Sequence, residues 1–173
     1  MMGKCLDVRP HAGRRSRELF GRRRGLARCL WADRHVLAEL VASWQAAKEG
    51  EPCGLLFGRA EHRAVHLVAA PALANVHPHP DRAFLIDPTE HVRSVRQARE
   101  AGLDALGFWH GHLRGPPVPS RDDEAGLLDA EAVAKVPRLL LIAGIGCGWA
   151  PVLRAWGRAG FTLGEVPVRA LRR

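Results

Sequence analysis

Residues 108–123 read FWHGHLRGPPVPSRDD, and this stretch decides how the rest of the chain is interpreted. Two histidines separated by one residue, His110 and His112, stand at the end of a short apolar run. On a β-strand, side chains at i and i+2 share a face, so both imidazoles can point at one spot. A loop rich in Pro and Gly then allows Asp123 to return as a third ligand. Two His nitrogens and one carboxylate oxygen, with a fourth position left open, are the usual way to hold a catalytic zinc ion.

The same residues have a plainer structural interpretation. A His-x-His pair alone is a weak sign of a metal site. Ser120 and Asp123 also fit the start of a helix, with Ser at the N-cap and an acidic residue at N3. The two interpretations are compatible, because the first turn of a helix capped by Ser120 would present Asp123 to the end of the strand.

A further carboxylate, Glu51, lies far upstream, just before the apolar segment CGLLFG at 53–58. A carboxylate is the usual base that takes the proton of a zinc-activated water. With Glu51 included, the sequence resembles the JAMM (MPN+) metalloprotease family, in its prokaryotic single-domain branch. The family pattern is a Glu ahead of a CGLLxG-like strand, then His-x-His, seven residues and Ser-x-x-Asp. The resemblance spans residues 30–168 and rests on Glu51, Cys53, Gly54, Leu55, Leu56, Gly58, His110, His112, Ser120 and Asp123, with Asn75 as a weaker similarity.

This resemblance implies a fold, a metal and a reaction. It implies an α/β fold of the cytidine-deaminase-like sandwich type and a Zn²⁺ site formed by His110, His112 and Asp123. Glu51 would act as the general base, and Ser120 would donate a hydrogen bond to the developing oxyanion or to the water. The implied activity is cleavage by a peptidase or isopeptidase after the C-terminal Gly-Gly of a ubiquitin-like or sulfur-carrier protein.

Two positions depart from the family pattern. Gly111 stands between the histidines where the family usually has Ser or Thr, and Leu113 stands where a Pro usually follows. Gly111 is expected to point away from the metal, and the prolines at 116, 117 and 119 can restore the stiffness of the loop. Neither change removes a ligand or the base, so we expect an intact site.

Two other functions fit the same resemblance. One is a catalytically silent MPN-type module that keeps the fold and binds a partner protein, which the complete set of site residues argues against. The other is a zinc hydrolase that acts on a small amide, and only substrate screening would separate it from a peptidase.

Composition points to one domain without a membrane span. A chain of 173 residues with 47% hydrophobic content can bury a core. No apolar run reaches the roughly 18 to 20 residues of a membrane helix, and the basic start is not followed by the apolar segment of a secretory signal. The four cysteines show no Cys-x-x-Cys pair, which favours reduced thiols and a cytoplasmic location.

The positive charge is concentrated at the N-terminus. Residues 1–30 contain eight Arg and one Lys against two acidic residues, a balance of +7 out of the total of +8. We expect residues 1–24 to form a flexible extension and residues 25–173 to form the metalloprotease domain. Such a tail can bind nucleic acid electrostatically, but no aromatic residues alternate with its arginines to stack on bases.

Hydrophobic patterns predict a mixed, largely antiparallel central sheet flanked by helices, because strands and helices do not alternate regularly. The second His-x-His, at His77 and His79, is predicted to be a loop because prolines follow both histidines. The GIGCG segment at 144–148 is predicted to be a turn between strands, since it lacks the Lys-Ser/Thr of a phosphate-binding loop. The predicted strands are 26–31, 53–59, 64–70, 84–86, 105–112, 138–143, 151–156 and 161–168, and the predicted helices are 33–49, 88–102 and 121–135.

Overall fold

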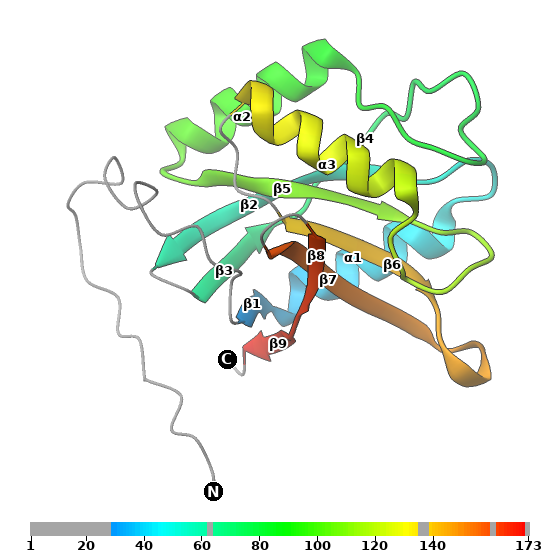
Figure 1. Ribbon diagram of the computed structural model, residues 1–173. Helices are drawn as coiled ribbons and strands as arrows, with labels where there is room; N and C mark the ends of the chain where they lie inside the picture. The colour runs from blue at the N-terminus through cyan, green and yellow to red at the C-terminus, as the bar shows by residue number, and fades with distance from the viewer. Residues whose placement is uncertain (1–28, 62–63, 135–138, 160–161, 172–173) are drawn as a thin grey trace, which may run out of the picture.

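The computed structural model describes residues 29–61, 64–134, 139–159 and 162–171 (Figure 1). The predicted N-terminal extension and its charge lie outside these residues. The described elements, in chain order, are β1 (Cys29–Asp33), α1 (Arg34–Ala46), β2 (Cys53–Glu61), β3 (Ala64–Ala69), β4 (Ala72–Leu73), α2 (Pro88–Glu100), β5 (Asp104–Gly111), α3 (Arg121–Ala134), β6 (Leu139–Ile145), a 3₁₀ turn (Cys147–Trp149), β7 (Pro151–Ala159), β8 (Thr162–Val166) and β9 (Val168–Leu171).

The strands form one mixed sheet, in the order β8-β7-β6-β5-β2-β3-β1-β9, with β4 paired to the beginning of β2. The pairs β1–β3, β1–β9 and β5–β6 are parallel, and the other described pairs are antiparallel. The predicted fold class, a largely antiparallel sheet with flanking helices, is therefore confirmed. The predicted turn at 144–148 is confirmed from Gly146 onward, where the chain connects β6 to β7, whereas Gly144 and Ile145 still belong to β6.

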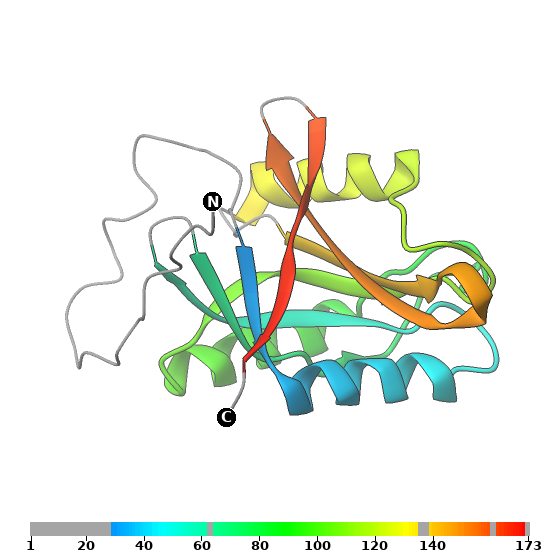
Figure 2. The ribbon, with the colours of Figure 1, turned by 90° about the horizontal axis from the view of Figure 1, so that it is seen from below.

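One segment near the C-terminus supplies both strands at the ends of the sheet order, β8 and β9. The sequence predicts a single strand over 161–168, and this prediction is wrong: the chain divides at Pro167 into β8, which pairs with β7, and β9, which pairs with β1. Proline has no N–H to donate to a strand ladder, but the Pro167 carbonyl accepts a hydrogen bond from the Leu30 N–H at 2.9 Å. Figure 2 shows the segment in red, crossing from β7 to β1, so that the sheet curves back on itself.

The helices cover the two faces of the sheet and bury separate groups of side chains. On β2, Leu56 packs in the cluster that contains α1, whereas Leu55 and Phe57 pack in the cluster beside α2. On β6, Leu140 and Ile142 pack in the cluster that contains Leu127 of α3. Because neighbouring residues of a strand point to opposite faces, α2 and α3 share one face and α1 covers the other (Figure 1).

A bulge in β5 determines which way its side chains point. The pairing of β2 with β5 shifts register at Gly107, whose φ is +148°. A Cβ at this position would lie 1.9 Å from the Leu139 carbonyl oxygen, so glycine is required. The extra residue allows both Leu106 and Trp109 to enter the core under α1. His110 is consequently left on the face of α2 and α3, and the predicted burial of Trp109 opposite His110 is confirmed.

The segment that leads into α2 agrees with the prediction at the helix start but not at residues 84–86. The start of α2 is confirmed, because Asp87 caps the helix and accepts a hydrogen bond from the Glu90 N–H at 2.9 Å. The predicted strand at 84–86 is wrong: only Ile86 pairs, in an isolated bridge to Asn75. Among the described residues, no helix combines the length and the apolar character needed to cross a membrane.

Candidate active site and metal centre

The end of β5 brings the two predicted histidines together. His110 lies within the strand and is fully buried, with its ring stacked on Phe84 at a centroid distance of 4.7 Å. His112 follows the strand, and its N–H donates to the Ala143 carbonyl of β6 at 2.9 Å. The two Nε2 atoms lie 3.0 Å apart. The structure thus places both imidazoles on one face of the strand, as the spacing predicts.

Two contacts fix the ring and backbone of His112. Its Nδ1 lies 2.8 Å from the Pro116 carbonyl oxygen, and its own carbonyl accepts a hydrogen bond from Trp44 Nε1 at 3.0 Å. A carbonyl can only accept, so Nδ1 carries the proton and the Nε2 of the neutral ring keeps its lone pair. This is the tautomer that a histidine needs when it binds a metal through Nε2.

Asp123 reaches the histidines from the first turn of α3. Its Oδ1 lies 3.3 Å from His110 Nε2, and its Oδ2 lies 3.8 Å from His112 Nε2. Ser120 caps the helix: its Oγ accepts a hydrogen bond from the Asp123 N–H at 3.1 Å. The Ser120 N–H and Oγ both donate to Asp123 Oδ2 at 2.7 Å. The helix cap and the carboxylate position are therefore one arrangement, and the two interpretations of Ser-x-x-Asp are both present in the structure.

The three side chains form a group that could hold a metal ion. Their ligand atoms all lie within 4.8 Å of one another. Among the described residues, this is the one group of three or more His, Cys, Asp or Glu side chains close enough to share a metal ion. Two imidazole nitrogens and one carboxylate oxygen fit the donor set of an open, four-coordinate site. The buried Nδ1 of His110 has no hydrogen-bond partner among the described residues.

The protonation states of the group also fit metal binding. Burial lowers the pKa of His110 to about 4, so its ring is neutral at neutral pH. Burial alone would raise the pKa of Asp123, but the neighbouring His112, His110 and Ser120 lower it to about 2. Asp123 in turn raises the pKa of His112. A neutral His110 beside an ionised Asp123 is the state in which both side chains can donate a lone pair.

Glu51 stands directly before β2, beside the end of β5. Cys53 pairs with His110 across these two strands, and the Gly111 N–H donates to the Pro52 carbonyl at 2.9 Å. Burial raises the pKa of the Glu51 carboxyl to about 7, an effect that the charge of His112 opposes and the charge of Asp123 increases. The predicted base is thus electrostatically coupled to two of the predicted ligands.

Asn75 is a positioning residue that the sequence indicates only weakly. Its Nδ2 donates to the Glu51 carbonyl at 2.9 Å and to the Ala83 carbonyl at 3.1 Å. Its Oδ1 accepts from the N–H groups of His77 and Leu85. One side chain therefore ties the 77–85 loop to the backbone of Glu51. The available signal was an Asn that follows a strand, without a pattern that indicated its partners.

The second His-x-His lies in a loop, as predicted, and the loop borders the site. The Glu51 N–H donates to the Pro80 carbonyl at 2.6 Å, and the charge of Asp81 contributes to the raised pKa of Glu51. The His79 N–H is bonded to His77 Nδ1 at 3.0 Å, which occupies that ring nitrogen within the loop itself. The loop supports the backbone of Glu51.

Comparison with known proteins gives a consistent result. Residues 33–157 match the family model of prokaryotic homologs of the JAB domain. The chain is 41% identical to the desampylase of Haloferax volcanii over 73 residues. This aligned segment covers 42% of this chain and 51% of the desampylase. The chain is 36% identical to the probable TtuB-protein conjugate cleaving protease of Thermus thermophilus over 96 residues. This segment covers 54% of this chain and 60% of the protease. The similarity thus spans little more than half of the length of these curated relatives.

A solved structure agrees with the fold. The solution structure of a protein from Desulfitobacterium hafniense superposes with a TM-score of 0.69 and 24% sequence identity, covering 83% of this chain and 94% of that one. The matched family segment contains Glu51, both histidines of His-x-His and the Ser-x-x-Asp pair. The chain therefore belongs to the prokaryotic homologs of the JAB domain, the branch that its resemblance to the JAMM (MPN+) family predicts.

Proposed function

We propose that this protein is a zinc-dependent peptidase or isopeptidase that cleaves after the C-terminal Gly-Gly of a ubiquitin-like or sulfur-carrier protein. The observation that carries the proposal is the group formed by His110, His112 and Asp123, whose His112 and Asp123 are electrostatically coupled to the Glu51 carboxyl. The relatives named as a desampylase and a conjugate-cleaving protease support the substrate class.

Each side chain has a distinct role in this proposal. His110, His112 and Asp123 would hold the zinc ion, which would supply Lewis-acid chemistry to a water and to the scissile carbonyl. Glu51 takes the proton of the attacking water and passes it to the leaving amine. A carboxyl with a pKa of about 7 can both accept and release a proton at neutral pH.

Ser120 is proposed to donate a hydrogen bond to the oxyanion or to the water. Its Oγ donates to Asp123 Oδ2 in the structure, and a hydroxyl hydrogen can rotate to a new acceptor when substrate arrives. The proposed setting is the cytoplasm, because the sequence contains no Cys-x-x-Cys pair and both Cys53 and Cys147 are free thiols.

The first test is metal content, measured by mass spectrometry on the purified protein and on a His110→Ala variant. About one zinc per chain, lost in the variant, is expected for a four-coordinate site with three protein ligands. Absence of zinc from both proteins, even after metal is added to the folded chain, would favour the silent binding module instead.

The second test is cleavage of a ubiquitin-like protein fused through Gly-Gly to a reporter. The wild type should cleave the fusion, whereas Glu51→Gln should retain zinc and lose turnover, because the amide cannot accept the proton. Turnover that persists in Glu51→Gln would contradict the assignment of the base.

A further inference from the structure

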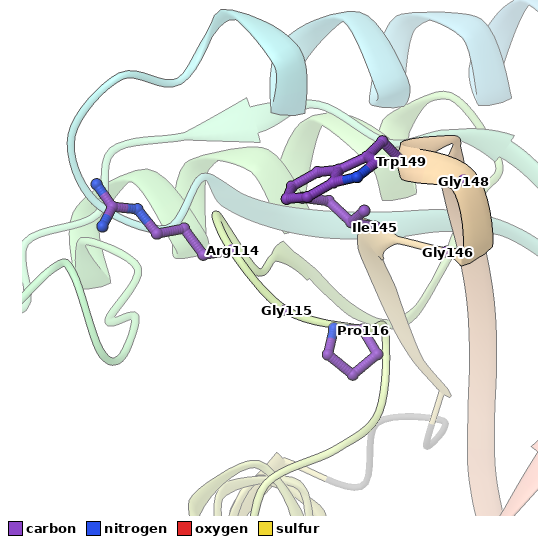
Figure 3. A pocket seen from close by; sticks show the side chains of 7 residues that line it. All are labelled: Arg114, Gly115, Pro116, Ile145, Gly146, Gly148 and Trp149. Carbon is purple, nitrogen blue, oxygen red and sulfur yellow. The ribbon is translucent and has the colours of Figure 1, made fainter.

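The two histidines of the proposed zinc site are held in different ways. His112 follows the usual pattern of metal ligands, in which the ring nitrogen that faces away from the metal donates to a protein oxygen. Its Nδ1 donates to the Pro116 carbonyl at 2.8 Å. Figure 3 shows the segment 114–116, which contains this proline, beside the connection between β6 and β7. His110 has no equivalent bond, because its buried Nδ1 finds no hydrogen-bond partner among the described residues.

A stacked aromatic ring takes the place of that bond at His110. When the Nε2 of a neutral imidazole faces a metal, the proton is on Nδ1, and an unpaired N–H does not fix the direction of the ring. The ring of Phe84 lies against the His110 imidazole, with a centroid distance of 4.7 Å and an angle of 23° between the two planes. In a closely packed interior, a nearly parallel ring at this distance blocks rotation of the imidazole about its Cβ–Cγ bond. The stacking therefore restrains the direction in which Nε2 points.

Phe84 lies in a segment without regular secondary structure, and the side chain of Asn75 holds that segment. Asn75 Nδ2 donates to the carbonyl of Ala83 at 3.1 Å, and Asn75 Oδ1 accepts from the N–H of Leu85 at 3.0 Å. One amide thus fixes the backbone on both sides of Phe84. The aromatic side chain is half-buried and packs against the cluster formed by Cys53, Leu55, Phe57, Ile86 and Ala98.

We propose that Phe84 is a positioning residue for the zinc ligand His110 and that Asn75 keeps Phe84 in place, a role that rests on the proposed function. Phe84 touches neither substrate nor metal, and it acts through the imidazole on which it stacks. Asn75 Nδ2 also donates to the Glu51 carbonyl at 2.9 Å. The same amide therefore holds the backbone of the proposed base and the ring that orients a proposed ligand.

The affinity of the full chain for Zn²⁺, measured by competition with a chromophoric chelator, tests this role. Phe84→Ala should weaken zinc binding by about tenfold or more, the usual effect of removing a group that orients a metal ligand. Phe84→Tyr keeps the flat ring and should bind zinc as the wild type does, whereas Phe84→Leu keeps apolar bulk without a flat face and should resemble Phe84→Ala. Val76→Ala removes an exposed apolar side chain from the same region and should leave the affinity unchanged. Equal affinity in Phe84→Ala and the wild type, or full rescue by Phe84→Leu, would overturn the proposal.

A second measurement separates positioning from a general loss of packing. Leu103 packs against the same cluster as Phe84, but it precedes β5, whereas His110 lies near the other end of that strand. Leu103→Ala should therefore lower the free energy of unfolding in urea without weakening zinc binding, whereas Phe84→Ala should do both. With Co²⁺ in place of zinc, the visible absorption of Phe84→Ala should differ from that of the wild type, because the spectrum depends on ligand geometry. Unchanged spectra and an equal loss of zinc affinity in both variants would show that Phe84 only supports the core.

A double variant tests the link to Asn75. Asn75→Ala should weaken zinc binding, and combining it with Phe84→Ala should add little, because both changes act through the same ring. Additive losses would refute the role of Asn75.

None of these readouts requires cleavage, so the positioning role and the proposed function can fail separately. Equal zinc binding by all variants, together with cleavage of the Gly-Gly fusion by the wild type, would refute the positioning role and leave the protease intact. Zinc affinity that depends on Phe84, without any cleavage, would keep the positioning role and refute the protease. A wild type that binds no zinc would overturn both.

Discussion

At the scale of single residues, Glu51 is held where its own negative charge is unfavourable. Burial raises the pKa of its carboxyl from 4.5 to about 7. Between these values the folded state keeps a proton that the unfolded state has lost. The free energy of unfolding therefore falls as pH rises through this window, and the destabilisation is complete above the folded-state pKa. Such a cost is expected of a group selected for proton transfer over stability.

This sign gives a prediction for the chelator-treated protein. Glu51→Gln should have a higher Tm than the wild type above about pH 7, and the difference should shrink towards about pH 5, where the wild-type carboxyl is also neutral. Differential scanning calorimetry across this range measures both Tm curves. Parallel curves for the two proteins would show that the carboxyl is solvated and carries no such shift.

Ser120 joins two effects that a pair of substitutions can separate. Ser120→Ala removes the hydroxyl that caps α3 and donates to Asp123, so the metal-free variant should lose about 1 kcal/mol of unfolding free energy. If the hydroxyl also acts in catalysis, kcat should fall by about 10²–10³. Urea unfolding and turnover of the Gly-Gly fusion measure the two losses. Ser120→Thr keeps the hydroxyl and serves as the control, and an equal loss of activity in both variants would argue against a role for the hydroxyl.

At the scale of elements, α1 packs against the end of β5 through Trp44 and Gly111. A Cβ at position 111 would lie 2.3 Å from Trp44 Cδ1 and 3.2 Å from Pro52 Cγ. The indole therefore occupies the space that the usual Ser or Thr of the family would need, and its Nε1 donates to the His112 carbonyl. Gly111 and Trp44 together explain how this chain departs from the family pattern without displacing the second histidine.

Gly111→Ser should consequently destabilise the protein by about 1–3 kcal/mol and weaken zinc binding, because the indole must move. Trp44→Leu in the same chain should recover part of the loss, so that the two changes are not additive. Urea unfolding and zinc titration of the single and double variants form the complete cycle. Strict additivity would mean that the two residues do not compete for the same space.

The features that the sequence predicts are the local ones, and the features that it misses depend on distant partners. The ligand spacing, the cap of α2 and the strand before His110 were predictable, because each depends on residues close together in the chain. The bulge at Gly107 and the division of the last strand at Pro167 were not, because each depends on a distant partner: Leu139 in one case and Leu30 in the other. The contacts of Asn75 belong to the same group, since its acceptors come from two separate segments.

At the scale of the whole molecule, most of the positive charge and the proposed site residues lie in different parts of the chain. Residues 1–30 carry +7 of the net charge of +8, whereas the site residues begin at Glu51. Deleting residues 1–24 should leave Tm and turnover unchanged and should abolish any salt-sensitive retention on immobilised DNA. Chromatography of both chains on such a column is the measurement. Equal retention would assign DNA binding to the domain, and a lowered Tm would show that the extension packs on it.

The segment that divides at Pro167 has a consequence for how the chain reaches this structure. It must bring Val168 beside Leu30, two positions at opposite ends of the described chain, before the edge of β1 is covered. Contacts of such long sequence separation form late and slowly, because the entropy of closing the loop is lost first. Until then, β1 presents unpaired N–H and C=O groups to other molecules. Refolding should therefore pass through an aggregation-prone stage, and dilute conditions should favour recovery of the native protein.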